Sequence, residues 1–115
     1  MSHQVLSFKY ALEGIAAAFK EEPNLKFHFA AAILVLTAGF YYQITQTEWL
    51  VLILTIGLIL TLELTNAAIE AVVDSFTDQA HPRAKLAKDV AAGAVLIGAI
   101  TATALGLIIF LPYLI

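Results

Sequence analysis

Three long apolar segments dominate the pattern of hydrophobic and polar positions along the chain. They cover residues 25–43, 49–74 and 89–113, and short polar segments connect them. A helix needs about 20 residues, at about 1.5 Å each, to cross a hydrocarbon core of roughly 30 Å. The runs are continuous rather than alternating, which favours helices over the strands of a membrane barrel. The pattern predicts an all-α membrane protein with three transmembrane helices in one domain, residues 1–115.

Residues 4–21 have a different pattern, with charged positions between apolar ones. The apolar side chains recur at helical spacing: Val5, Phe8, Leu12, Ile15 and Phe19. Such a pattern predicts an amphipathic helix on the membrane surface, and a helix packed on the end of the bundle fits it equally well. Pro23 is expected to interrupt the helix before the first span.

The basic residues and the aromatic residues predict how the chain is oriented. All six basic side chains fall before or at the first span or between the second and third: Lys9, Lys20, Lys26, Arg83, Lys85 and Lys88. Residues 43–48 contain none. The positive-inside rule then predicts a cytoplasmic N-terminus, a cytoplasmic connector between spans two and three, and an outer C-terminus. An aromatic belt at the expected outer boundary agrees: Tyr41, Tyr42, Trp49 and Tyr113.

Composition supports a membrane location and excludes several classes of function. Apolar residues make up 61% of the chain and charged residues 13%, with a mean hydropathy of +0.88. The net charge of −3 gives no indication of a nucleic-acid partner, and the absence of cysteine excludes disulfides and thiolate metal sites.

A polar stripe interrupts the second apolar segment at Glu63, Asn66, Glu70 and Asp74. At about 100° per residue these positions lie within roughly 80° of one another on a helix. Counted from Trp49, Glu63 lies about 21 Å along the axis, within the inner third of a core of roughly 30 Å. The stripe is therefore expected to descend from the cytoplasmic boundary into the membrane.

Three interpretations of this stripe remain open. Its side chains can serve only to hydrogen-bond neighbouring helices, or they can belong to a proton or cation transporter. They can also form a catalytic site at the inner interface, with Glu63 as a general base. The acidic residues gather toward one side of the membrane instead of near its middle, which favours chemistry at the surface. A set of carboxylates without cysteine suits a hard cation such as Mg²⁺.

Small residues recur every fourth position in the third segment, at Ala94, Gly98, Ala102 and Gly106. Small side chains at this interval allow helix backbones to approach closely in lipid. These four positions predict a packing face, and association of the chain with copies of itself.

Two motifs carry a resemblance to a known family. ELTNAAIEAVVD (residues 63–74) resembles the E-x-x-N-x-A-I-E-x-x-V-D signature of the prokaryotic diacylglycerol kinases, and AKDVAAGAVL (residues 87–96) is similar to a second family element. FKYA (residues 8–11) with Gly14 also matches. The ending IIFLPY (residues 108–113) resembles the Gram-positive-type branch, which phosphorylates undecaprenol more than diacylglycerol.

The resemblance implies a homotrimeric bundle in the bacterial inner (plasma) membrane, with active sites between subunits at the cytoplasmic side. It implies transfer of the γ-phosphate of ATP to a lipid hydroxyl: of undecaprenol, or alternatively of diacylglycerol. By matching position, Glu63 is the general base, and Asn66 orients Glu63 or the lipid. Glu22 and Glu70 hold Mg²⁺. The implied nucleotide contacts are Tyr10, Glu22, Glu70, Gln79, Ala80, His81, Lys88 and Asp89.

The chain departs from the family pattern at a few positions. His28 stands where diacylglycerol-type members have a glutamate near the start of the first span, and residues 78–81 read DQAH. These departures concern the choice of lipid and the details of nucleotide contact. The rival hypothesis of a small oligomeric proton or cation transporter predicts flux that needs Glu63 but no ATP.

Overall fold

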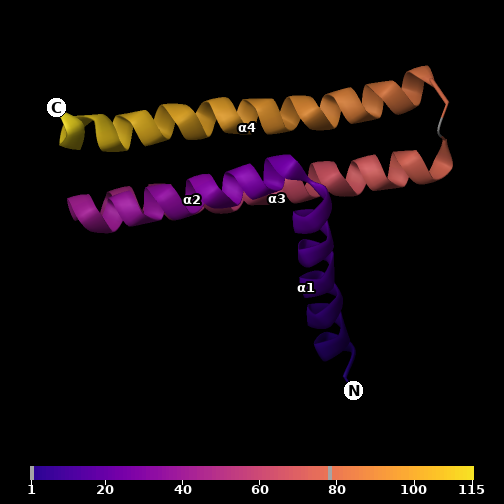
Figure 1. The fold of residues 1–115 in the computed structure, drawn as a ribbon, viewed down its shortest axis with the longest axis horizontal. Helices are drawn as coiled ribbons and strands as arrows, with labels where there is room; N and C mark the ends of the chain where they lie inside the picture. Colours follow the sequence, from indigo (N-terminus) through magenta and orange to yellow (C-terminus); the bar gives the residue numbers. More distant parts are fainter. Residues whose placement is uncertain (1, 78) are drawn as a thin grey trace.

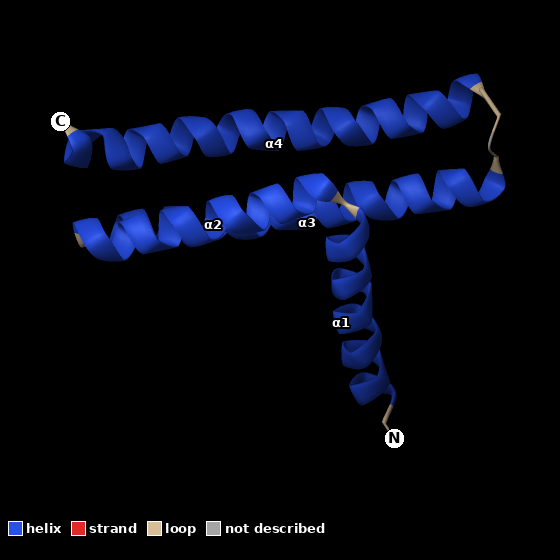
Figure 2. Ribbon diagram, in the orientation of Figure 1, coloured by secondary structure: helices blue, strands red, loops and turns tan. Residues whose placement is uncertain are grey.

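The computed structural model describes residues 2–77 and 79–115, and every regular element in these ranges is an α-helix. The helices are α1 (His3–Glu21), α2 (Pro23–Tyr42), α3 (Gln46–Phe76) and α4 (Pro82–Leu114). α2, α3 and α4 run along one another, whereas α1 leaves them sideways (Figures 1 and 2). The prediction of an all-α fold is confirmed.

α2, α3 and α4 are the three helices that are long and apolar enough to cross a membrane, as predicted. They have 20, 31 and 33 residues. At about 1.5 Å per residue, α3 and α4 are each between about 45 and 50 Å long, which exceeds a hydrocarbon core of roughly 30 Å. Part of both helices must therefore extend beyond the lipid.

α3 and α4 both extend beyond the apolar spans predicted at 49–74 and 89–113. α3 starts early because Thr45 and Glu48 form a capping box: the Glu48 N–H donates to Thr45 Oγ1 at 3.2 Å, and the Thr45 N–H donates to Glu48 Oε1 at 2.9 Å. α4 starts at Pro82, whose ring suits the first helical position, after an N-cap in which the Arg83 N–H donates to His81 Nδ1. A hydropathy pattern detects only the apolar part of such helices.

The turn between α2 and α3 depends on a left-handed residue and a close contact. Gln43, with φ 52°, ends α2. Gly39 is buried beneath the ring of Trp49, where an added Cβ would lie 2.8 Å from the nearest ring carbon. The chain therefore reverses tightly, and a small core of Ile44, Leu52 and Ile109 forms next to the turn.

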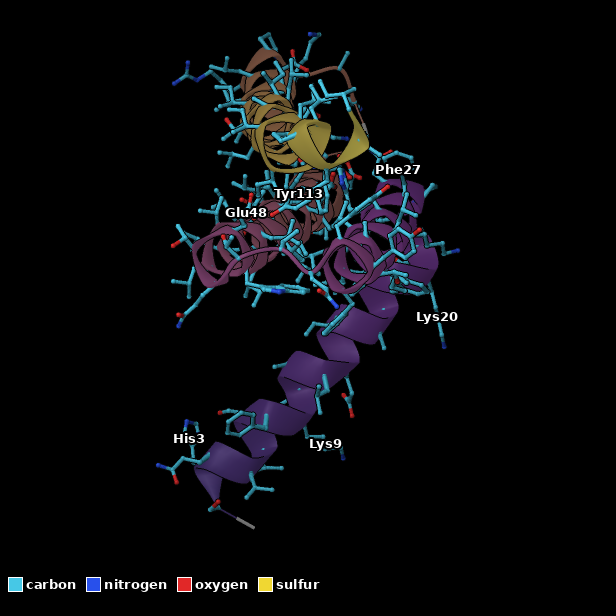
Figure 3. All side chains as sticks on the ribbon, turned by 90° about the vertical axis from the view of Figure 1, so that its left-hand side faces the viewer. His3, Lys9, Lys20, Phe27, Glu48 and Tyr113 are labelled. Atoms are coloured by element: carbon cyan, nitrogen blue, oxygen red, sulfur yellow. The ribbon has the colours of Figure 1, made fainter. Side chains whose placement is uncertain are left out.

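Glu48 and Tyr113 join the start of α3 to the end of α4. The Tyr113 hydroxyl donates to Glu48 Oε1, and Figure 3, which views the molecule from this end, shows the two residues next to each other. Farther along the pair, Gly98 of α4 is buried against Leu62 of α3, and a Cβ added to this glycine would lie 2.6 Å from Leu62 Cδ1. Among the four small residues of the predicted packing face, Gly98 thus closes the α3–α4 contact within one chain.

Many apolar side chains of the three long helices remain exposed in the single chain. Ile97 and Ile108 of α4, for example, are 69% and 70% exposed. A water-soluble domain would not leave so large an apolar surface open, whereas lipid or further protein can cover it. α1 has no buried residue, and its Phe19 ring contacts Phe29 of α2 edge-on at 5.4 Å between centroids.

Candidate functional site

The site is built around Glu63, the one charged side chain that is buried among the described residues. It lies on α3 and is only 4% exposed. Two apolar residues of α3, Leu52 and Ile59, are buried on the same helix, so this side of α3 faces protein. The carboxylate therefore points into the bundle and not toward lipid.

His28 of α2 is the polar side chain that meets this carboxylate. Its Nε2 lies 2.9 Å from Glu63 Oε1, and its side chain is 17% exposed. The two atoms are close enough to share a proton, and no hydrogen bond to Oε1 is found among the described residues. His28 lies on the face of α2 that also buries Leu25 and Ala32, which explains why the ring turns toward α3.

Glu22 and Glu70 lie together, with Glu70 about two helical turns beyond Glu63 on α3. Both line a hollow of about 480 Å³ between α1 and α3. The pKa of Glu22 is raised, first by burial and then by the neighbouring negative charges, of which Glu70 contributes most. Two carboxyl groups held this close favour a cation between them, which is the donor chemistry that Mg²⁺ prefers.

Asn66 hydrogen-bonds Glu70, and no hydrogen bond between Asn66 and Glu63 is found among the described residues. Its Nδ2 donates to Glu70 Oε1 at 3.2 Å, while its Oδ1 is buried without a hydrogen-bond partner among the described residues. The amide therefore orients one of the two carboxylates expected to hold the metal. Among the described residues no group of three or more histidine or acidic side chains gathers as a ready-made metal site, so any metal there needs ligands from elsewhere, such as substrate phosphates.

A second hollow, of about 610 Å³, lies where α3 ends and α4 begins. Asp74 borders both hollows, and its Oδ1 accepts from Lys88 Nζ at 2.7 Å. The residues around this second hollow are Val73, Asp74, Thr77, Gln79, Ala80, His81, Pro82, Ala84, Lys85, Lys88 and Asp89. Five residues predicted from the resemblance to contact nucleotide thus gather here: Gln79, Ala80, His81, Lys88 and Asp89.

Glu63 lines neither of the two hollows, and the same holds for Tyr10, a predicted site residue that the single chain does not bring to the others. Tyr10 is 61% exposed on α1. α1 projects away from the other helices, and Figure 3 shows His3, Lys9 and Lys20 spaced along its length. A role for Tyr10 in nucleotide binding therefore needs another chain or a different position of α1.

His28 is a site residue that sequence reasoning does not identify. In the sequence it is noticeable only as a departure from the family pattern. Its spacing from the buried positions Leu25 and Ala32 is the signal that places it on the inner face of α2. Spacing along one helix cannot tell which residue of α3 that face meets.

An apolar groove of about 420 Å³ is formed by α2, α3 and α4. Its walls include Val35, Ile59 and Ile109, and His28 and Thr55 are among its few polar residues. The imidazole therefore touches both the groove and the buried carboxylate.

The fold and this arrangement define an α-helical membrane protein with a buried carboxylate close to a cluster of acidic and basic side chains. Residues 9–110 match the sequence profile of the family described as prokaryotic diacylglycerol kinase. The chain belongs to that family, and the resemblance drawn from residues 63–74 and 87–96 is confirmed.

Individual relatives extend the comparison over most of the chain. The undecaprenol kinase of Bacillus subtilis is 48% identical over 94% of this chain and 88% of its own length. The diacylglycerol kinase of Synechocystis is 41% identical over 94% of this chain, which spans 62% of that protein. The diacylglycerol kinase of Haemophilus influenzae is 32% identical over 84% of this chain and 82% of its own length.

Proposed function

We propose that this chain, a membrane lipid kinase by family, transfers the γ-phosphate of ATP to the hydroxyl of undecaprenol and so makes undecaprenyl phosphate. The observation that carries the proposal is the buried Glu63, which is held inside the bundle against His28, about two helical turns before Glu70 on α3. The similarity to the Bacillus subtilis undecaprenol kinase over nearly the whole chain supports the choice of lipid.

Glu63 acts as the general base in this proposal. The oxygen of the lipid hydroxyl attacks the γ-phosphorus of ATP while its proton passes to the Glu63 carboxylate, and ADP leaves. A positioned base typically accelerates such a step by about 10² to 10⁴-fold. Burial suits this role because it keeps water, a competing nucleophile, away from the carboxylate.

Glu22 and Glu70 hold Mg²⁺ in this proposal, with Asn66 orienting Glu70. Their paired carboxyl groups fit the ion, because Mg²⁺ is commonly bound by one or two carboxylates together with substrate phosphates. When bound, Mg²⁺ neutralises phosphate charge during transfer. The chain's own contribution is to keep the two carboxylates beside the hollow that Asp74 shares with the nucleotide residues.

The nucleotide lies in the second hollow, against Gln79, Ala80, His81, Lys88 and Asp89. Lys88 contacts a phosphate, which replaces Asp74 as the partner of the Lys88 ammonium group. Tyr10 completes the nucleotide contact from α1 of a neighbouring subunit. This last role agrees with an active site shared between the chains of a homotrimer.

The chain lies in the inner membrane with its N-terminus and the α3–α4 connector in the cytoplasm and its C-terminus outside. The sideways course of α1, its lack of buried residues and its exposed Phe8 and Leu12 support an amphipathic helix on the membrane surface. The trimer is supported by the wide exposed apolar surface of α3 and α4.

Diacylglycerol is the second candidate substrate, because two of the similar relatives are diacylglycerol kinases. Ion transport is less favoured, since the acidic groups gather with Lys88 at one end of the bundle and not along a path across it.

A lipid panel tests the proposal. Purified protein in mixed micelles receives γ-labelled ATP and Mg²⁺ with undecaprenol, with diacylglycerol, or with neither lipid. We expect label in undecaprenyl phosphate at a higher kcat/KM than in phosphatidic acid. Greater efficiency with diacylglycerol would transfer the assignment to that lipid, and labelling of neither would overturn the kinase proposal.

A further inference from the structure

The His28–Glu63 pair is the most informative contact that the proposed roles leave unused. Both side chains are inside the bundle, at 17% and 4% exposure, and Nε2 lies 2.9 Å from Oε1. Nitrogen and oxygen atoms that face each other at this distance in a protein interior need one proton between them, because two opposed lone pairs would repel. The pair therefore holds one proton, on either the imidazole or the carboxyl group.

A general base must be unprotonated when its substrate arrives. If Glu63 is the base, the shared proton has to rest on His28 Nε2 and the imidazole has to act as a donor. A buried carboxylate without a compensating donor or positive charge is strongly destabilised. Among the described residues no hydrogen bond reaches Oε1, and Asn66 donates to Glu70, so the compensation falls to His28.

We propose that His28 is a positioning residue for Glu63: through its Nε2–H it holds the carboxylate in the orientation in which it meets the lipid hydroxyl. The inference rests on the proposed function and adds a residue to it. The face of α2 that includes Leu25 and Ala32 fixes the ring against α3. Because one N–H donor occupies only one of the lone pairs of a carboxylate, Glu63 keeps the capacity to accept the proton of the substrate.

His28 also borders the apolar groove between α2, α3 and α4. The same side chain touches Glu63. The imidazole therefore lies at the boundary between an apolar surface and the carboxylate. Replacing it changes the surroundings of the base without touching the residues placed around the nucleotide.

Three variants of full-length protein test the inference. His28→Phe keeps a ring of similar size but removes the donor, His28→Gln offers an N–H at a similar reach, and His28→Asn is one methylene shorter. His3→Phe is the matched control, because His3 is exposed at the start of α1. Each protein is assayed for kcat with the lipid substrate and for the KM of ATP, after its oligomeric state and melting temperature have been compared with wild type.

We expect His28→Phe to lower kcat by about 10²-fold, the effect of a mispositioned catalytic group, with the KM of ATP unchanged. His28→Gln is expected to keep most of the wild-type kcat, whereas His28→Asn is expected to lose as much as His28→Phe. His3→Phe is expected to behave as wild type. If His28→Phe fails to assemble, the comparison of kcat between His28→Gln and His28→Asn tests the positioning role instead.

Wild-type kcat in His28→Phe, equal loss in the Gln and Asn variants, or a change confined to the KM of ATP would each overturn the positioning role alone. Wild-type protein that phosphorylates no lipid would overturn the proposed function, and this inference with it. The two failures are thus distinguished by the activity of the wild type.

Discussion

Glu63 is a buried carboxylate in a membrane helix, and a residue of this kind suggests a function. Insertion of an acidic side chain at the centre of a membrane helix costs roughly 2.5–3.5 kcal/mol, and less toward the edge. The chain places this carboxylate against α2, with only 4% of the residue exposed and one histidine beside it. Proton abstraction requires a carboxylate that can still accept, and Oε1 accepts no hydrogen bond among the described residues.

Lys88 provides a residue-scale test of the nucleotide site. It is paired with Asp74 at 2.7 Å on the rim of the second hollow, where a phosphate would compete for the same ammonium group. Lys88→Gln is expected to raise the KM of ATP by about tenfold or more, because a hydrogen bond to a charged group is lost. Steady-state kinetics at saturating lipid measure the effect.

Arg83→Gln is the matched control for Lys88→Gln. Arg83 is exposed on the same helix, and only its backbone N–H takes part in the cap with His81. An equal rise of KM in both variants would indicate general attraction of ATP by positive charge and would contradict a specific phosphate contact.

The polar stripe of α3 is predictable from the sequence, but its contacts are not. Glu63, Asn66 and Glu70 follow from helical periodicity, because the three positions share a face whatever surrounds it. The partners of that stripe depend on how α2 is rotated about its axis against α3. The approach of His28 and the contact of Asn66 with Glu70 are therefore found only in the folded chain.

At the scale of elements, the junction between α1 and α2 and the last two turns of α3 together form the carboxylate pair. The break between α1 and α2 at Glu22, with φ −109° and ψ 105°, turns this residue toward Glu70. Pro23 then starts α2 in the first helical position. The junction between two helices thus places a side chain of the proposed metal site.

Glu22→Gln tests that arrangement. Removing one of two carboxylates is expected to raise the Mg²⁺ concentration for half-maximal activity by about tenfold or more, with little change in the melting temperature of the metal-free protein. Titration of Mg²⁺ into the protein with a nonhydrolysable ATP analogue provides a second readout. Glu21→Gln is the control, since Glu21 is an exposed neighbour.

The two glutamate variants are compared with each other. A similar Mg²⁺ dependence in Glu22→Gln and wild type would exclude Glu22 as a ligand. A shift of the same size in Glu21→Gln would assign the effect to net negative charge at the junction.

The elements themselves are largely predictable from the sequence. Hydropathy locates all three spans. The high apolar content indicates that lipid covers their surface. α3 and α4 begin before the predicted spans, because the capping box at Thr45 and the helix start at Pro82 lie in polar sequence. Lys88 and Asp89 consequently lie inside α4 and not at its first turn.

At the scale of the whole molecule, the three long helices form a thin bundle with a polar end and an apolar middle. The extents of 51 × 42 × 20 Å reflect long helices in a shallow arrangement, with α1 reaching out to one side. So much exposed apolar surface fits a chain that is covered by lipid and by copies of itself. The proposed orientation puts the acidic and basic cluster in reach of cytoplasmic ATP.

Cysteine labelling tests that orientation directly. The chain has no cysteine, so single substitutions give unambiguous reporters. Thr47→Cys, near the α2–α3 turn, is expected to react with a membrane-impermeant maleimide in intact cells. Gln4→Cys, at the start of α1, is expected to react only after the cells are opened, and the opposite result would reverse the topology.

The central claim is that Glu63 takes the proton of a lipid alcohol during phosphate transfer from ATP. The most direct measurement is the single-turnover rate of label transfer from γ-labelled ATP to undecaprenol, for wild type and for Glu63→Gln. The variant keeps the size of the side chain and removes the base. We expect its rate to fall by about 10² to 10⁴-fold with oligomeric state and nucleotide binding unchanged. Transfer at the wild-type rate by a folded Glu63→Gln protein would contradict the account.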